Sequence, residues 1–145
     1  MSIAITGATG QLGSHVIATL RQRIPATEIV AVVRDPAKAA ALAAQGVAVR
    51  TASYDDATAL RSAFVGVDRL LFISGSEIGR RGPQHRNVVE AATAAGVERI
   101  LYTSVLNLDG VGAPLPVAPA PILPEQLIRE SGLASTLLRN GWYSE

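Results

Sequence analysis

Short, nearly continuous apolar runs alternate along the chain with longer segments whose apolar positions recur every three or four residues. Such runs are typical of strands buried on both faces of a parallel sheet, and the longer spacing is typical of helices packed on one face. The pattern predicts strands over 2–6, 28–33, 47–51, 69–74, 98–104 and 134–138. It predicts helices over 11–23, 35–44, 55–64 and 83–95, and a short one from 124 or 125 to 131. Regular alternation with short connections predicts an α/β fold, a doubly wound parallel sheet in three α/β/α layers.

The alternation breaks between residues 105 and 124, which hold five prolines and two glycines. Proline lacks the backbone N–H and clashes with the preceding turn, so we expect neither helix nor central strand there. A long irregular stretch of this kind can be a functional lid, a disordered segment or a linker, and a mobile surface loop fits equally well. We expect a single domain over residues 1–145, with this loop inside it.

Three glycines with the spacing G-x-x-G-x-x-G stand between the first predicted strand and the first predicted helix. Gly7 would allow a tight turn, Gly10 would let a phosphate group approach the backbone, and Gly13 would let helix and strand pack closely. In this position the motif predicts a site where the pyrophosphate of a dinucleotide meets the helix N-terminus. The alternative is a plain glycine-rich turn between strand and helix.

Arg34 directly follows the second predicted strand. Dinucleotide folds that prefer NAD usually carry an acid there for the ribose hydroxyl, whereas an arginine suits the 2′-phosphate of NADP. A shift of one residue would put Asp35 in the acid's place, but Pro36 after it favours Asp35 as a helix cap. Arg34 therefore predicts NADP, and an ordinary exposed arginine is the alternative.

Small and polar residues mark the ends of the fourth and fifth predicted strands, at 73–75 and 102–104. The carboxyl ends of parallel strands form the ligand-binding edge of open α/β sheets, so these segments are candidates to lie near a nicotinamide ribose. His15 and His85 fall on predicted helices and are interpreted as surface or packing residues, although His85 could face a substrate. Neither histidine has the spacing of a metal ligand, and we predict no metal site.

Composition narrows the partners and the chemistry. Lys and Arg number 13 against 12 Asp and Glu, which gives no support to a nucleic-acid or anionic-membrane partner. The chain has no cysteine, which excludes disulfides and thiolate chemistry. No signal-like start and no bilayer-length apolar run are present, so we expect a cytoplasmic protein without membrane contact. Lys38 is the only lysine, so any lysine-dependent step would have to use it.

Four segments, 6–13, 33–38, 81–88 and 137–145, resemble the atypical short-chain dehydrogenase/reductases of the NmrA-like group, and within it the quinone reductases. The resemblance implies a Rossmann domain that binds NADPH and passes hydride to a quinone. It implies a pyrophosphate site at Gly7, Ala8, Thr9, Gly10, Gln11 and Leu12, with the 2′-phosphate at Arg34. It also implies Tyr54 near the adenine, Ile73, Ser74 and Gly75 near the ribose, and Gly141, Trp142 and Tyr143 near the nicotinamide. Thr103, at the end of the fifth predicted strand, is a further candidate cofactor contact from its place at the ligand-binding edge.

The sequence departs from that family in two ways. Family members continue past the Trp-Tyr-Ser-Glu motif into a smaller substrate-binding lobe, which we expect to be lacking here. Family members also have a polar, acid-rich helix where this sequence has the proline-rich stretch. Separately, the Tyr-x-x-x-Lys pair of the general short-chain dehydrogenase mechanism is excluded, because no tyrosine precedes Lys38 by four residues. We therefore name no catalytic acid or base. A quinone is already electrophilic, and orientation against nicotinamide could supply most of the rate.

Two other functions stay open from the sequence. A non-catalytic NADP sensor of the NmrA type would need neither the Tyr/Lys pair nor the lobe. A truncated remnant that folds poorly would explain the proline-rich stretch and the abrupt end. A homodimer through the predicted helix 83–95 is possible, although no residue singles it out.

Overall fold

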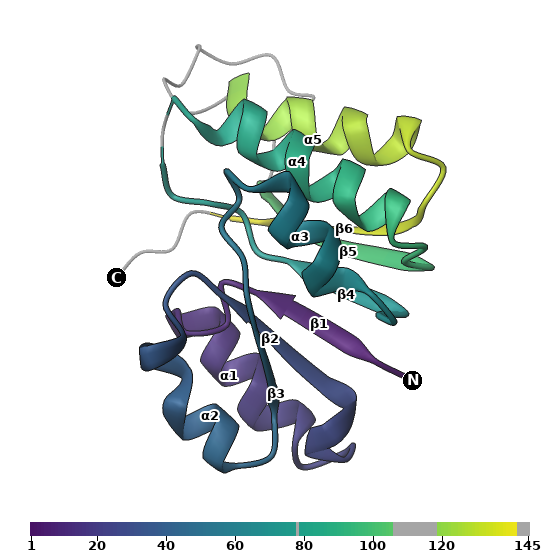
Figure 1. The fold of residues 1–145 in the computed structure, drawn as a ribbon. Coiled ribbons are helices and arrows are strands. Elements are labelled where there is room, and N and C mark those ends of the chain that lie inside the picture. Colours follow the sequence, from purple (N-terminus) through teal and green to yellow (C-terminus); the bar gives the residue numbers. More distant parts are fainter. Residues whose placement is uncertain (78, 106–118, 142–145) are drawn as a thin grey trace.

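The computed structural model describes residues 1–77, 79–105 and 119–141, and in them a six-stranded sheet with the order β3-β2-β1-β4-β5-β6. The strands are β1 (Ile3–Thr6), β2 (Ile29–Val33), β3 (Ala48–Thr51), β4 (Arg69–Phe72), β5 (Arg99–Val105) and β6 (Ala134–Asn140). Every neighbouring pair is parallel. The chain winds outward from β1 to one side and then, from β4, to the other (Figure 1). The predicted doubly wound parallel sheet is confirmed.

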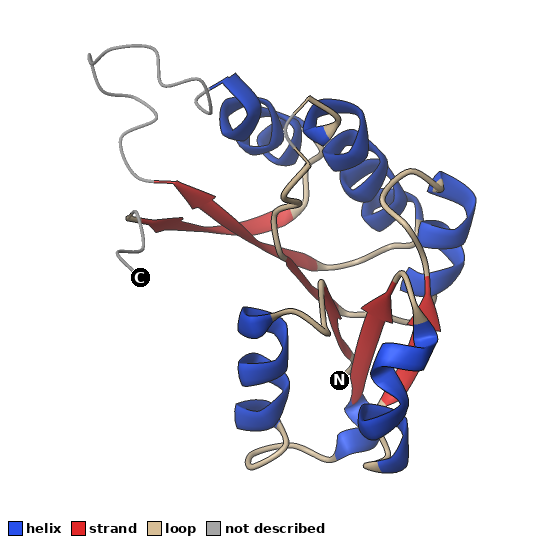
Figure 2. Cartoon of the chain, turned by 90° about the vertical axis from the view of Figure 1, so that its left-hand side faces the viewer, coloured by secondary structure: helices blue, strands red, loops and turns tan. Residues whose placement is uncertain are grey.

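Helices cover both faces of this sheet (Figures 1 and 2). They are α1 (Gln11–Leu20), α2 (Ala40–Ala44), α3 (Ala57–Phe64), α4 (Arg81–Ala94) and α5 (Pro119–Glu130), with 3₁₀ turns η1 (Ala26–Glu28) and η2 (Pro36–Ala39). Helices α1 and α2 lie on one face, and α3, α4 and α5 pack side by side on the other. Within the described residues, no helix is both long and apolar enough for a bilayer.

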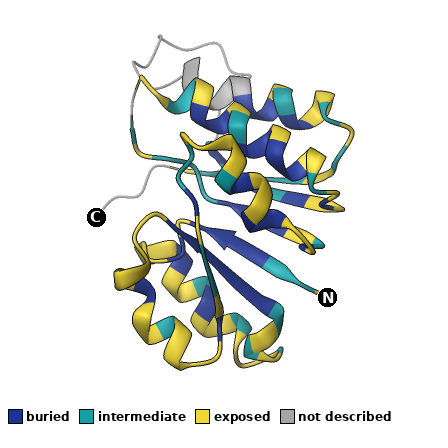
Figure 3. Cartoon of the chain, in the orientation of Figure 1, coloured by how far each residue is buried: buried dark blue, intermediate teal, exposed yellow. Residues whose placement is uncertain are grey.

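The core consists of two clusters separated by the sheet (Figure 3). Successive side chains of a strand point to opposite faces, so Val30 and Val32 join the cluster under α3 and α4, whereas Ala31 and Val33 join the one under α1. All of Ile29–Val33 is buried. The apolar runs therefore have the two-sided burial that their pattern predicts.

Several predicted boundaries move by a few residues. The β4 strand ends at Phe72 rather than at residue 74, which leaves Ile73 and Ser74 in a loop. Helix α4 begins at Arg81, and Pro83 sits in its first turn, where no intrahelical partner is needed for an N–H group. The segment after Asp35 begins as a 3₁₀ turn, capped by the Asp35 carboxylate, which accepts from the Ala37 N–H at 3.0 Å.

The prediction that proline excludes a helix throughout 105–124 is wrong at its end, because α5 begins at Pro119 and contains Pro124. Proline in the first helical turn costs little, because N–H groups there lack intrahelical partners. Pro124 does remove one helical hydrogen bond, and burial of Ile128 on α5 against the sheet helps to offset that loss. Residues 106–118 of the expected loop lie outside the described residues.

A buried carboxylate fastens α5 to the sheet. Glu125 accepts from Arg139 of β6 at 3.0 and 2.7 Å, from Arg129 at 3.0 Å, and from the hydroxyl of Ser104 on β5. Burial raises the pKa of Glu125, but the hydrogen bonds from Arg139 and Ser104 and the charges of both arginines outweigh it and hold the pKa below its usual range. A paired carboxylate of this kind is far less costly to bury than an isolated one.

Candidate functional site

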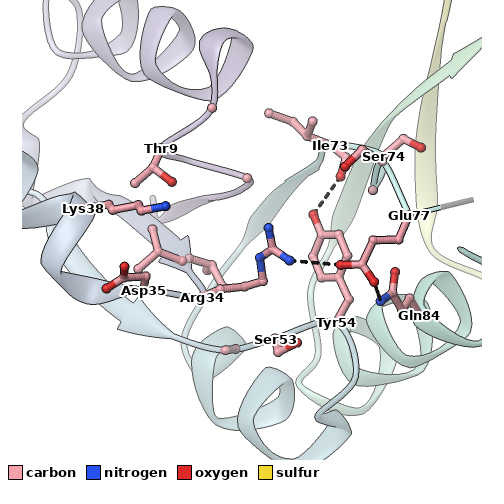
Figure 4. Close-up of a pocket in the computed structure, with 17 residues that line it drawn as sticks. Thr9, Arg34, Asp35, Lys38, Ser53, Tyr54, Ile73, Ser74, Glu77 and Gln84 are labelled. Atoms are coloured by element: carbon pink, nitrogen blue, oxygen red, sulfur yellow. Dashed lines mark hydrogen bonds and ion pairs between the residues drawn. The ribbon is translucent and has the colours of Figure 1, made fainter. Parts of the chain in front are cut away.

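A cavity of about 390 Å³ opens at the carboxyl ends of β1, β2 and β4, where the strand order reverses (Figure 4). This position in an open parallel sheet is the usual place for a ligand. The cavity is lined by Gly7, Thr9, Gly10, Val32, Val33, Arg34, Asp35, Lys38, Ala52, Ser53, Tyr54, Ile73, Ser74, Gly75, Ser76, Glu77 and Gln84. It thus joins the glycine loop, the residues after β2 and the loop after β4.

The glycine loop forms the first wall. Gly7 has φ +61°, a backbone conformation that residues with a side chain rarely adopt. Its carbonyl accepts from the Gly10 N–H at 3.0 Å. A Cβ on Gly13 would lie 2.3 Å from the Gly7 oxygen, so only glycine fits there. Helix α1 then begins with Gly10 as its N-cap, without a side-chain cap and without an acid in the first turn. Amides not used by capping side chains, together with the helix dipole, suit an anion.

The loop after β4 forms the opposite wall. The Ile73 N–H donates to the hydroxyl oxygen of Thr6 at 3.0 Å, and the Ser74 N–H donates to the hydroxyl oxygen of Thr103 at 2.9 Å. Thr6 in turn donates to the Leu71 carbonyl at 3.4 Å. Side chains from β1 and β5 therefore hold the backbone of this wall from both sides.

His85 of α4 holds the third amide of the wall. Its Nε2 accepts from the Gly75 N–H at 3.2 Å, which places the proton of the neutral ring on Nδ1. The ring is fully buried, with its centroid 4.9 Å from that of Phe72 and 5.9 Å from that of Tyr102. Burial, and secondarily the charge of Arg81, lowers the pKa of His85 to about 4. The histidine is therefore a neutral packing residue, as the sequence favoured, and it also positions the cavity wall.

Tyr54 closes the cavity between the two walls. Its hydroxyl donates to the Ile73 carbonyl at 2.7 Å, and its backbone carbonyl accepts from Asn87 at 2.9 Å. Its ring meets Phe72 edge-on at 5.5 Å. Burial raises the pKa of Tyr54, so the hydroxyl stays protonated and donates at neutral pH.

Charged side chains gather at the end of the cavity beyond β2. Arg34 and Lys38 reach into it from the segment that follows β2 (Figure 4). The Arg34 guanidinium lies 3.0 Å from the carboxylate of Glu77, which also accepts from Gln84 at 3.2 Å. The cavity thus combines an uncapped helix start with two cations, a combination suited to a ligand with several phosphates.

The structure brings eight of the predicted site residues to this cavity: Gly7, Thr9, Gly10, Arg34, Tyr54, Ile73, Ser74 and Gly75. Ala8 is buried beneath the loop, whereas Gln11 and Leu12 are exposed and do not line it. Thr103 lies behind Ser74. Gly141 is exposed directly after β6 and is not among the lining residues, and Trp142 and Tyr143 lie outside the described residues.

Several lining residues have little signal in the sequence. Lys38 stands out only as the single lysine, while Ser53, Glu77 and Gln84 are polar residues of common kinds. Glu77 was not predicted, and its position shortly after the predicted strand 69–74 is the one signal that could have placed it near the ligand-binding edge.

A glycine loop at the switch point of a doubly wound sheet, with cations after the second strand, defines a dinucleotide-binding α/β domain. A family model described as NAD(P)H-binding matches residues 7–145, and the chain belongs to that family. The chain is 59% identical to quinone oxidoreductase 2 of Escherichia coli strain K12, an alignment that spans 99% of this chain and 49% of that protein. It is 36% identical to an NmrA-like family domain-containing oxidoreductase of Aspergillus flavus, over 100% of this chain and 49% of the relative.

Solved structures give the same assignment. A crystal structure of an NADPH-dependent quinone oxidoreductase from Escherichia coli complexed with NADPH superposes with a TM-score of 0.92 at 59% identity, covering 98% of this chain and 50% of the other. A Citrobacter triphenylmethane reductase complexed with NADP(H) gives 0.94 at 44% identity, covering 99% and 50%. The predicted kinship with NmrA-like quinone reductases is confirmed. The chain spans about half the length of the curated relatives it matches.

Proposed function

We propose that this chain binds NADPH and is the cofactor-binding part of an NADPH-dependent quinone reductase. One observation carries the proposal: a single cavity joins the glycine loop to Arg34 and Lys38. The distribution of uncapped amides and positive charge suits a dinucleotide whose pyrophosphate and 2′-phosphate are held at separate places. The names of the relatives, quinone oxidoreductase and NADP(H)-binding reductase, support the same choice.

The described residues fit this cofactor. Backbone amides at the start of α1 would hold the pyrophosphate, and Arg34 with Lys38 would hold the 2′-phosphate. Gly75 lines the opposite wall, where a Cβ would be in ordinary van der Waals contact with the Tyr54 ring at 3.5 Å. NADPH supplies the hydride when bound, while these residues bind and orient it.

Acceptor chemistry is proposed without a catalytic acid or base. Orientation of the nicotinamide against an electrophilic quinone supplies the main rate effect, and water protonates the reduced oxygens. Quinone-dependent oxidation of NADPH by the purified chain, followed by nicotinamide absorbance with menadione, tests this part. Binding of NADPH without turnover would favour the sensor function instead.

Titration calorimetry with NADPH and NADH, in the wild type and in Arg34→Ala, tests the cofactor assignment. NADPH should bind more tightly than NADH. The substitution should weaken NADPH binding by about tenfold or more and change NADH binding by less than about twofold, since hydrogen bonds to charged groups are worth about 1.5–3 kcal/mol. Arg61→Ala removes an exposed arginine of α3 outside the cavity and is the matched control. Equal affinities of the wild type for the two cofactors would contradict the role of Arg34.

Homodimer formation and a cytoplasmic location stay predictions. Helix α4 is flanked by α3 and α5, so a second copy could reach only its outer face, near the exposed Arg86 and Glu90. Sedimentation velocity of the wild type and of a variant with both side chains changed to alanine tests such a contact.

A further inference from the structure

The Arg34 guanidinium already forms an ion pair with a carboxylate of the same chain. Its Nη1 lies 3.0 Å from Oε1 of Glu77, although the two residues are 43 positions apart in sequence. Arg34 follows β2 and Glu77 belongs to the loop after β4, so the pair spans the cavity between its two sides (Figure 4). The Glu77 carboxylate is thus paired with the Arg34 guanidinium, the group that suits the 2′-phosphate.

Glu77 has other partners that hold it at this place. Its Oε2 accepts from Gln84 at 3.2 Å and lies 3.7 Å from Nη1 of Arg80. Asp55 in turn binds Arg80 at 2.9 Å and Gln84 at 3.2 Å. If Arg34 bound another anion instead, Glu77 would still have Gln84 and Arg80 as partners. The change of partner would therefore leave neither Arg34 nor Glu77 without one.

We propose that Glu77 is a specificity-determining residue, whose carboxylate occupies Arg34 in the absence of cofactor and so limits how much more tightly the chain binds NADP than NAD. The inference rests on the proposed NADPH binding and deepens it. A 2′-phosphate must either displace Glu77 from Arg34 or share the guanidinium with it. The ribose hydroxyl of NAD carries no charge and makes no such demand.

The size of the effect follows from exposure. The Arg34 side chain is 72% exposed and that of Glu77 is 39% exposed, so water screens the pair. An exposed ion pair contributes up to about fivefold to an equilibrium constant. The need to give up this pair on binding should therefore lower the wild type's affinity for NADP by a factor of that order, and it should leave the affinity for NAD almost unchanged.

Calorimetric titration of the chain with NADP⁺ and with NAD⁺ tests the proposal in the wild type and in Glu77→Gln. The variant keeps the shape of the side chain and removes its charge. We expect its affinity for NADP⁺ to rise by about fivefold and its affinity for NAD⁺ to change by less than about twofold. In an Arg34→Ala background, the same Glu77→Gln change should raise NADP⁺ affinity by less than about twofold, because the pair no longer exists.

Two further variants serve as controls. Glu90→Gln removes the same charge from an exposed pair with Arg86, 3.9 Å away on α4 and outside the cavity lining, and should leave both affinities unchanged. Glu77→Asp keeps the charge and should keep NADP⁺ affinity within about twofold of the wild type. Thermal unfolding of each variant verifies that it is folded, and Glu77→Ala replaces Glu77→Gln if that variant is not.

The outcomes separate this inference from the proposed function. Wild type that binds NADP⁺, together with a Glu77→Gln variant whose NADP⁺ affinity is unchanged, overturns the role of Glu77 alone. An equal gain for NADP⁺ and NAD⁺, or a full gain in the Arg34→Ala background, also overturns it. Absence of NADP⁺ binding in wild type and variant alike overturns the proposed function and this inference together.

Discussion

The two walls of the cavity are built by opposite means. The glycine wall owes its shape to side chains that are missing at Gly7, Gly10 and Gly13. The wall after β4 owes its shape to side chains that are present, with acceptors from three separate elements on three successive amides. One wall is contained in seven neighbouring residues, whereas the other joins residues that are 67, 29 and 10 positions apart.

This difference separates the tasks of the two walls. The N–H groups at the start of α1 have no side-chain cap and can donate to an anion. Amides of Ile73, Ser74 and Gly75 already donate to protein acceptors and cannot serve a phosphate. Of these two walls, the glycine wall is therefore the one with amides available to an anion, and in our proposal the rest of the ligand lies against the wall after β4.

The largest loss of stability is expected from a side chain at Gly13, where the glycine wall has the least space. Gly13→Ala places a Cβ 2.3 Å from the Gly7 oxygen and 2.7 Å from the Ala8 Cα, both backbone atoms that cannot move alone. We expect the free energy of unfolding to fall by about 3 kcal/mol or more, measured by urea denaturation. Gly10→Ala is the matched control, since its Cβ would lie 3.3 Å from the same oxygen at an allowed φ of −77°. A loss of less than about 1 kcal/mol in Gly13→Ala would contradict this account.

His85, which holds the wall after β4, should make the free energy of unfolding depend on pH. The pKa of His85 falls from its ordinary 6.5 to about 4 in the folded chain, so the unfolded chain binds the proton first. The stability that the neutral His85 ring contributes is therefore fully present above pH 6.5 and is lost as the pH falls toward 4. Between pH 7 and pH 5 the loss amounts to about 2 kcal/mol of unfolding free energy.

Urea denaturation at the two pH values measures this slope. His85→Gln should remove it, whatever the variant's absolute stability, while His15→Gln, at an exposed site on α1, should keep it. An unchanged slope in His85→Gln would assign the acid sensitivity to other groups.

A smaller effect is expected from a single acceptor of that wall. Thr103→Val keeps the shape of the side chain but removes the oxygen that accepts from the Ser74 N–H at 2.9 Å. The expected loss is about 1 kcal/mol of unfolding free energy, read from chemical denaturation. Thr93→Val is the control, because its hydroxyl donates only to Val89 within the same helix. Equal effects of the two changes would remove the special role of Thr103.

The sequence is informative wherever the determinant is local. The two-sided burial of Ile29–Val33 is visible in one apolar run, and the tight turn before α1 is visible in the spacing of Gly7, Gly10 and Gly13. Arg34 is placed at the cavity because a residue directly after a strand has little freedom to be elsewhere. These features need no knowledge of distant partners.

Features that depend on distant partners could not be predicted in this way. Glu77 is an unremarked acid until the fold brings it to Arg34, 43 residues away. Glu125 reads as a helix-start residue, and its role appears only with Arg139 and Ser104 around it. The same contacts explain why α5 tolerates Pro124, since packing outweighs a local preference against the helix.

The hydrogen bond between Ser74 and Thr103 also sets an order of events during synthesis. The glycine turn is translated before the wall opposite it, and the Ser74 N–H of that wall has no acceptor until residue 103 has been translated. A nascent chain that stops before β5 would hold the N–H groups of this wall only through Thr6 and His85. The ability to bind a dinucleotide should therefore appear abruptly as the chain lengthens, once β5 pairs with β4. Proteolysis of stalled chains of increasing length, with and without the dinucleotide, would show at which length binding begins to protect the chain.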